Sequence, residues 1–315
     1  MRLVLKTLKV VGLVLLILIA LIAFFIFCMF TAPMCPKNYT KTVETGGEIE
    51  TKYLSMGAHE VKYTEVEAPG DWKKFEAFYP AELEQGEAPW PVVVFANGTG
   101  VGASRYKALF KHLASWGFIV LGNEDPSTCT GASAEATLVW LLEQNSDQDS
   151  VFYQKVDTKH IGISGHSQGS VAVFNAVSEQ PHGTMFTCAV SLSPTQLDVA
   201  VAIGLNYDPG KMSVPTLILA ASENDVITPE GVRELSDVIP ADTITALRPG
   251  MDHGKMLYSA DGYVTAWFLW LLQDDQEAAK AFVGDNAELL NNSLYQNQQI
   301  EIKSRCTFGP EQQKK

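Results

Sequence analysis

The fold is decided by residues 160–177, which read HIGISGHSQGSVAVFNAV. The apolar run 160–164 predicts a short buried strand, and the apolar spacing over 168–177 predicts a helix. Between them Ser167 lies in a G-x-S-x-G pattern, which in this context is typical of a sharp strand-to-helix turn that exposes a serine hydroxyl. Glycines are needed on both sides because side chains there would collide with the neighbouring strand and helix. The stretch therefore predicts a nucleophilic serine at the carboxyl end of a strand.

Strand and helix patterns alternate on both sides of this motif. Apolar runs predict strands at 92–96, 118–121, 161–164, 186–192, 216–221 and 243–247, and helical spacing appears at 104–116, 132–142, 168–177, 229–238 and 261–272. This alternation predicts an α/β fold with a mostly parallel central sheet covered by helices. Residues 59–66 and 74–79 predict two antiparallel strands, and 300–302 an edge strand. We expect one domain over 59–302, followed by a polar tail over 303–315.

A serine nucleophile needs a base, and the base needs an acid to orient it. In proteins with this turn the chain order is serine, acid, histidine. Among the six histidines, only His253 lies well beyond the motif and after a later strand and acid. Asp225 follows the run 216–221 at the carboxyl end of a strand, where sites of open α/β sheets form, and Glu223 is the fallback acid. The sequence predicts a triad of Ser167, Asp225 and His253; the alternative is a turn serine, a helix-capping aspartate and a loop histidine.

Two backbone N–H groups are candidates for stabilising an oxyanion. Gln168 stands at the start of the helix that follows Ser167, and its N–H can donate there. The strand 92–96 runs into Asn-Gly-Thr-Gly, residues 97–100, whose glycines expose further N–H groups, Thr99 among them. No Lys-Ser or Lys-Thr follows these glycines, which argues against a phosphate-binding loop.

The amino-terminal region contains an uncharged apolar run, VVGLVLLILIALIAFFIFCMF, over residues 10–30. About 20 such residues span a bilayer, and the basic stub 1–9 favours a cytoplasmic amino terminus. A cleaved signal peptide would have a shorter apolar region and a small-residue cleavage site. We therefore expect one uncleaved transmembrane signal anchor in the cell membrane, then a tether over 31–58. The catalytic domain would lie on the extracytoplasmic side.

The composition is that of an acidic globular protein. The 315 residues carry a net charge of −13 and are 46% hydrophobic, which argues against disorder and against binding nucleic acid. Without the three cations of the stub, 20 basic and 36 acidic residues remain, a net charge of −16. That acidity opposes electrostatic binding to anionic lipid, so the anchor is what would hold the domain at the membrane.

Cysteines and metal ligands follow no strong pattern. Cys28 lies in the apolar run, while Cys35, Cys129, Cys188 and Cys306 would face an oxidising space. Four cysteines permit three pairings, and a free, buried Cys188 is the alternative. The sequence has neither an H-E-x-x-H nor a C-x-x-C pattern. We expect no metal and no cofactor.

Several stretches together resemble the α/β-hydrolase superfamily, in particular dienelactone hydrolase-like enzymes, cutinases and polyester (PET) hydrolases. Besides the serine motif they are NGT (97–99), LASWGF (113–118), SLSP (191–194), VPTLI (214–218), END (223–225), His253 and AWF (266–268). The resemblance implies an α/β-hydrolase fold, the triad named above, the N–H groups of Thr99 and Gln168 as the oxyanion hole, and substrate contacts at Gly98, His166 and Thr195. Thr99 and Thr195 stand where polyester hydrolases carry aromatic residues, which argues against polyester activity. The short segment between Pro194 and Val214 leaves no room for a large cap.

These features predict a membrane-anchored serine ester hydrolase that works through an acyl-enzyme on accessible, small-molecule or lipid esters. A second hypothesis is a lipase, phospholipid deacylase or transacylase at the membrane. A third is a non-catalytic, tethered binding protein on a hydrolase scaffold. The sequence leaves the natural ester and the oligomeric state open.

Overall fold

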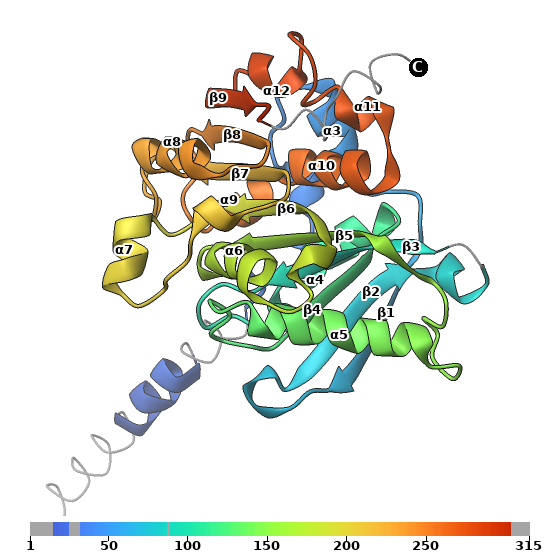
Figure 1. The fold of residues 1–315 in the computed structure, drawn as a ribbon. Helices are drawn as coiled ribbons and strands as arrows, with labels where there is room; N and C mark the ends of the chain where they lie inside the picture. The colour runs from blue at the N-terminus through green and yellow to red at the C-terminus, as the bar shows by residue number, and fades with distance from the viewer. Residues whose placement is uncertain (1–14, 25–31, 87–88, 304–315) are drawn as a thin grey trace, which may run out of the picture.

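A single nine-stranded sheet organises the part of the chain that the computed structural model describes, residues 15–24, 32–86 and 89–303 (Figure 1). The strand order is β1-β2-β4-β3-β5-β6-β7-β8-β9. The strands are β1 (Val61–Glu67), β2 (Lys74–Pro80), β3 (Trp90–Ala96), β4 (Ile119–Asn123), β5 (Val156–His166), β6 (Phe186–Leu192), β7 (Thr216–Ala221), β8 (Thr243–Arg248) and β9 (Gln296–Glu301). The six central strands, β4 to β8 with β3, pair in parallel. The edge strands β1 and β9, and β2 next to β1, pair antiparallel with their neighbours.

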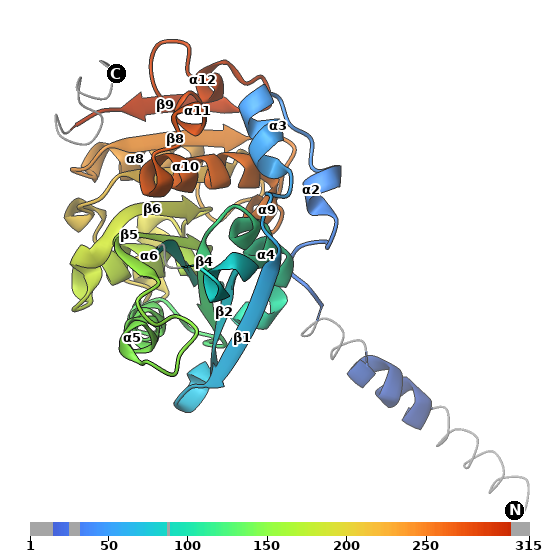
Figure 2. The ribbon, with the colours of Figure 1, turned by 90° about the vertical axis from the view of Figure 1, so that its right-hand side faces the viewer.

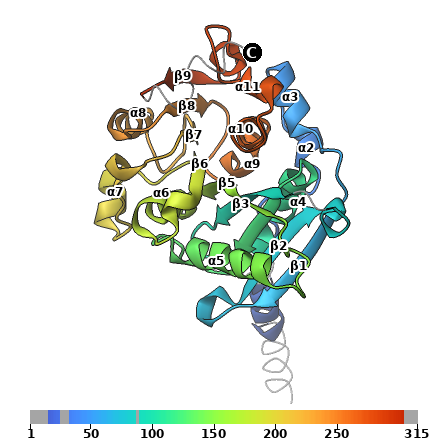
Figure 3. The same ribbon diagram turned by 45° about the vertical axis from the view of Figure 1, so that its right-hand side comes forward.

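Helices cover both faces of this sheet, as the turned views show (Figures 2 and 3). One face packs against α5 (Ala132–Ser146), α6 (Gln168–Glu179) and α8 (Pro229–Val238). The other packs against α4 (Lys107–Ser115), α9 (Met256–Ser259) and α10 (Asp261–Gln273). Along β3, Val92 and Val94 enter the first core, whereas Val93 and Phe95 enter the second. A parallel strand buried on both faces has to be apolar throughout, which explains the apolar runs in the sequence.

The predicted α/β fold with a mostly parallel sheet is confirmed. Strands β6 and β7 and helix α8 have the predicted bounds, and β9 is the edge strand expected near residue 300. The segment between β6 and β7 holds only the short helices α7 (Leu197–Ala202) and η5 (Pro209–Lys211), as expected for a fold without a large cap.

The segment predicted as a tether is structured instead. Residues 32–58 contain α2 (Tyr39–Thr42) and α3 (Glu48–Leu54), and α3 packs on α10. Tyr39 and Tyr53 are buried in the core beside the sheet. The segment is therefore not an extended tether: its prolines precede α2, Gly46 and Gly47 lie between α2 and α3, and both short helices bury aromatic side chains.

The predicted anchor lies largely outside the described residues. Of the run 10–30 the structure describes only residues 15–24, which are helical. Across the described ranges no helix combines the length and apolar character needed to cross a membrane. The stub 1–9 and most of the tail 303–315 also lie outside them.

Cys35, Cys129 and Cys188 are free thiols in the structure, and Cys306 lies outside the described residues. Cys188 is buried in β6, as in the alternative considered from the sequence. Burial raises the pKa of the Cys35 and Cys188 thiols, which keeps both uncharged and unreactive.

Candidate active site

Three side chains meet where the parallel strands end. Ser167 directly follows β5, Asp225 lies four residues after β7, and His253 lies five residues after β8. His253 Nε2 is 2.9 Å from Ser167 Oγ, and His253 Nδ1 is 2.7 Å from Asp225 Oδ1. Because the carboxylate can only accept, Nδ1 carries the proton and Nε2 accepts from the serine hydroxyl. The predicted residues are therefore joined in one hydrogen-bonded chain.

The turn at Ser167 has the strained geometry expected of an exposed nucleophile. Its φ is 61° and its ψ is −123°, in the left-handed half of conformational space where a serine is rare. A Cβ at Gly165 would lie 2.2 Å from the Gly169 carbonyl oxygen, and one at Gly169 2.1 Å from the Ala96 carbonyl oxygen. Glycine at both positions lets β5, β3 and α6 approach closely enough to hold the turn.

Both carboxylate oxygens of Asp225 accept hydrogen bonds. Its Oδ2 accepts from Ser193 Oγ at 2.6 Å and from the Ala221 N–H at 2.7 Å, while Oδ1 also accepts from the Val226 N–H at 2.7 Å. Burial alone would raise the pKa of this carboxyl, but the hydrogen bonds from His253, Ser193 and the backbone outweigh it and lower the pKa. Asp225 is therefore an anion that can orient His253 and stabilise its protonated form.

Ser193 was not singled out as a site residue from the sequence. It directly follows β6, and its φ of 47° turns the chain at the strand end. The signal was available, because Ser193 and Asp225 follow the adjacent parallel strands β6 and β7. Residues in such positions meet at the same edge of a sheet.

The predicted oxyanion donors follow the neighbouring strands β3 and β5. Gln168 is the first residue of α6, where a helix leaves the backbone N–H without an internal acceptor. Thr99 is exposed in the loop after β3. That loop is held by Tyr106, whose hydroxyl accepts from the Gly98 N–H at 3.0 Å, and a Cβ at Gly98 would lie 3.5 Å from the His166 carbonyl oxygen. The loop thus borders the serine turn.

Gly98, His166 and Thr195, at which the resemblance implies substrate contacts, are buried in this structure. The carbonyl oxygen of Thr195 accepts from Tyr207 at 2.7 Å. His166 Nε2 donates to the carbonyl oxygen of His253 at 2.7 Å, and the two imidazole rings lie 4.6 Å apart between centroids. His166 therefore packs against His253 and holds its backbone.

Because His166 is buried and uncharged, the free energy of unfolding should depend on pH in the acid range. Burial, and then the nearby His253, lower the pKa of His166 to about 4. Unfolded His166 takes up its proton at about pH 6.5, so between pH 6.5 and 4 protons favour the unfolded chain and stability falls as the pH falls. The contribution of His166 to this loss is roughly 3 kcal/mol.

We expect His166→Gln, which keeps a donor but cannot titrate, to lose less stability than the wild type over this range. Urea unfolding of both proteins at pH 7, 5 and 4 measures the difference. Parallel pH profiles for the two proteins would contradict the buried, neutral His166.

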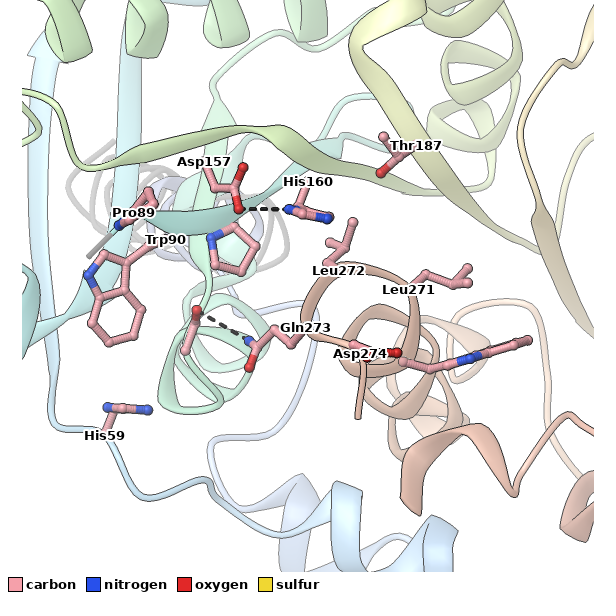
Figure 4. Close-up of a pocket in the computed structure, with 13 residues that line it drawn as sticks. His59, Pro89, Trp90, Asp157, His160, Thr187, Leu271, Leu272, Gln273 and Asp274 are labelled. Carbon is pink, nitrogen blue, oxygen red and sulfur yellow. Dashed lines mark hydrogen bonds and ion pairs between the residues drawn. The ribbon is translucent and has the colours of Figure 1, made fainter. Parts of the chain in front are cut away.

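A surface cavity of about 800 Å³ lies elsewhere (Figure 4). It is lined by Trp90 at the start of β3, by Asp157 and His160 early in β5, and by Thr187 early in β6. In Figure 4 Asp157 and His160 face one another, and their 2.7 Å contact is drawn. The cavity is at the amino ends of the parallel strands, so it is separate from the site at Ser167.

A family model described as PET hydrolase-like matches residues 40–239. The chain belongs to this family. The match covers β1 to α8, so it includes Ser167 and Asp225 and ends before His253. Membership agrees with the predicted cutinase and polyester hydrolase group within the α/β-hydrolase superfamily.

Two curated proteins are also similar to this PET hydrolase-like chain. Chlorophyllase-1, chloroplastic, of Citrus sinensis is 24% identical over 143 residues, 42% of this chain and 43% of that protein. Chlorophyllase-1, chloroplastic, of Citrus unshiu is 23% identical over 189 residues, 57% of this chain and 54% of that protein. The chain thus spans about half the length of the curated relatives it matches.

Proposed function

We propose that this protein is a serine carboxylic ester hydrolase with Ser167 as nucleophile, His253 as general base and acid, and Asp225 as the orienting anion. The observation that carries the proposal is the continuous set of hydrogen bonds that joins Ser167 Oγ to His253 Nε2 at 2.9 Å and His253 Nδ1 to Asp225 Oδ1 at 2.7 Å. Membership of the PET hydrolase-like family supports the same class of reaction.

In this mechanism Ser167 Oγ attacks the ester carbonyl carbon while His253 Nε2 takes the hydroxyl proton. The N–H groups of Thr99 and Gln168 would stabilise the negative oxygen, each at about 3–4 kcal/mol. The carbon–oxygen bond to the alcohol then breaks, and His253 returns the proton to that alcohol. Water repeats the sequence on the acyl-serine and releases the acid. Asp225 stabilises the imidazolium in both halves.

The substrates that fit this site are accessible esters. Only the short helices α7 and η5 lie between β6 and β7, and Ser167 is partly exposed. We expect the full chain, solubilised in detergent, to hydrolyse p-nitrophenyl acetate and butyrate, with longer acyl chains defining its preference. Absence of turnover on the whole panel would contradict the proposal.

One observation favours the second candidate, a lipase, phospholipid deacylase or transacylase. Val199, Val201 and Ile203, in and just after α7, expose apolar side chains, with Val201 63% exposed. The Gln196 N–H before α7 donates to the Val226 carbonyl oxygen, so this apolar group adjoins the Asp225 loop. An apolar surface beside the site suits lipid substrates. Product analysis with phospholipid vesicles, in water and with an added alcohol acceptor, separates hydrolysis from acyl transfer.

We further propose that residues 10–30 anchor the protein in the cell membrane, with the hydrolase domain on the extracytoplasmic side. The uncharged apolar run and the preceding cations support this orientation. The ester would then be met at the membrane surface. Membrane fractionation with protease accessibility of the intact cells tests it, and recovery of the full chain in the soluble fraction would contradict it.

The alternative of a non-catalytic binding protein predicts a site that does not react. A fluorophosphonate labels activated serines only, so absence of labelling on the folded protein would favour that alternative.

A further inference from the structure

His253 is carried by residues 249–260, which connect β8 to α10 and contain α9. Arg248, the last residue of β8, and Asp261, the first residue of α10, bound this connection. Both are charged, and they are only 2% and 1% exposed. Neither residue belongs to the triad, so their burial has to be explained by the partners that they bind.

The Arg248 end is held by an ion pair with α3. Arg248 Nη1 lies 2.8 Å from Glu50 Oε1, and Nη2 donates to the carbonyl oxygen of Glu44. Tyr295 donates to the same Glu50 oxygen at 2.7 Å and accepts from Arg248 at 2.6 Å. Glu50 Oε2 accepts from the Gly46 N–H and from Asn292, each at 2.8 Å. Such a fully hydrogen-bonded buried ion pair fixes geometry, because losing one partner leaves the other charge unpaired.

The Asp261 end is held by α2 and α4. Asp261 Oδ2 accepts from the Tyr39 hydroxyl at 2.5 Å and lies 2.6 Å from His112 Nδ1. His112 Nε2 lies 2.9 Å from the carbonyl oxygen of Ser55, just after α3. Both imidazole nitrogens therefore face acceptors, which fits a protonated ring. Burial lowers the pKa of His112, but the Asp261 carboxylate outweighs it, and the net effect is a raised pKa.

Packing brings the same segment against the connection between these two ends. The rings of Tyr39 and Tyr258, which is in α9, lie 5.8 Å apart in an edge-to-face contact. A Cβ at Gly262, in the first turn of α10, would lie 2.3 Å from the Glu50 carbonyl oxygen. Figure 2 shows α2 and α3 running beside α9 and α10. Residues 39–55 thus contact both ends and the middle of the His253 connection.

We infer that Tyr39 in α2 and Glu50 in α3 act as a clamp on the two ends of the His253 connection and are positioning residues for the reaction. The inference rests on the proposed function, since it concerns the base of that reaction. His166 and Asn224 also hold His253, through its carbonyl oxygen at 2.7 Å and its N–H at 3.3 Å, so losing one arm of the clamp loosens the base without releasing it. A displacement near 1 Å in a catalytic group costs about 100-fold in rate. Tyr39 and Glu50 therefore support the catalytic base from outside the triad.

The test uses the full chain with paired substitutions. Tyr39→Phe and Glu50→Gln remove one arm each. Tyr53→Phe and Lys52→Gln are matched controls, because Tyr53 bonds Asp275 at 2.7 Å and Lys52 bonds Glu277 at 2.6 Å, both beyond the carboxyl end of α10. We expect kcat for p-nitrophenyl butyrate to fall about 10- to 100-fold in the first pair, with KM nearly unchanged and the controls at wild-type values. Hydrogen exchange should rise over residues 249–260 in the first pair alone.

The outcomes separate the clamp from the proposed function. Wild-type kcat and wild-type exchange in both Tyr39→Phe and Glu50→Gln would overturn the clamp. An even rise in hydrogen exchange over the whole domain would also overturn the clamp, because it would mean that Tyr39 and Glu50 stabilise the fold as a whole and not the His253 connection in particular. If the wild type cleaves no ester but exchange still rises over 249–260 in these variants, the proposed function fails and the clamp stands. Should Glu50→Gln not fold, Tyr39→Phe, which removes a hydroxyl and no charge, decides the question.

Discussion

Ser167→Ala is expected to reduce kcat/KM for p-nitrophenyl butyrate by a factor on the order of 10⁴ or more, to near background. The substitution removes only the hydroxyl group, whose oxygen lies 2.9 Å from His253 Nε2, and no acyl-enzyme can form without that oxygen. The fold should survive, because the Ser167 N–H that donates to the Leu192 carbonyl oxygen at 3.0 Å is retained. Initial rates, with melting temperatures of both proteins, measure the two effects.

Ser178→Ala is the matched control for that substitution. Ser178 lies at the far end of the same helix, α6, and its hydroxyl makes a long 3.5 Å contact with Glu179. We expect wild-type rates from it. Substantial turnover by Ser167→Ala would mean that another group attacks the ester.

Asp225→Asn is expected to lower kcat by about 10⁴-fold while leaving the backbone in place. An amide can donate a hydrogen bond to His253 Nδ1, which selects the tautomer with its proton on Nε2. That nitrogen then cannot accept the Ser167 proton. Single-turnover and steady-state rates on p-nitrophenyl butyrate measure the loss.

Glu223→Gln is the control for Asp225→Asn, since Glu223 was the fallback acid in the sequence and is exposed in the structure. Its rate should match the wild type. A large loss in Glu223→Gln together with an active Asp225→Asn would reverse the assignment of the acid.

Much of this fold can be predicted from the sequence, because the local sequence signals agree with the tertiary structure. The runs at β6 and β7 are buried on both faces, so apolar character alone marks their limits. Helix α8 begins at Pro229 after Thr228, whose side chain accepts from the Gly231 N–H as an amino-terminal cap. Chain order and strand ends were sufficient to select Ser167, Asp225 and His253 as candidates.

The parts that sequence reasoning missed depend on distant partners. Helices α2 and α3 have four and seven residues, too short to form on propensity alone, and they are held by packing. Glu50 and Arg248 lie 198 residues apart, and no pattern pairs them before the fold is known. No sequence pattern predicts that His166 is buried either, because the side chain before a nucleophilic serine can face the substrate or the protein interior.

Identification of the serine that reacts with a fluorophosphonate tests the central proposal most directly. The full chain is labelled and digested, and the modified peptide is found by mass spectrometry, with Ser167→Ala treated in parallel. We expect one adduct, on Ser167, and none in the variant. An adduct on any other serine, or an unlabelled wild type that is folded, would contradict the proposed active site.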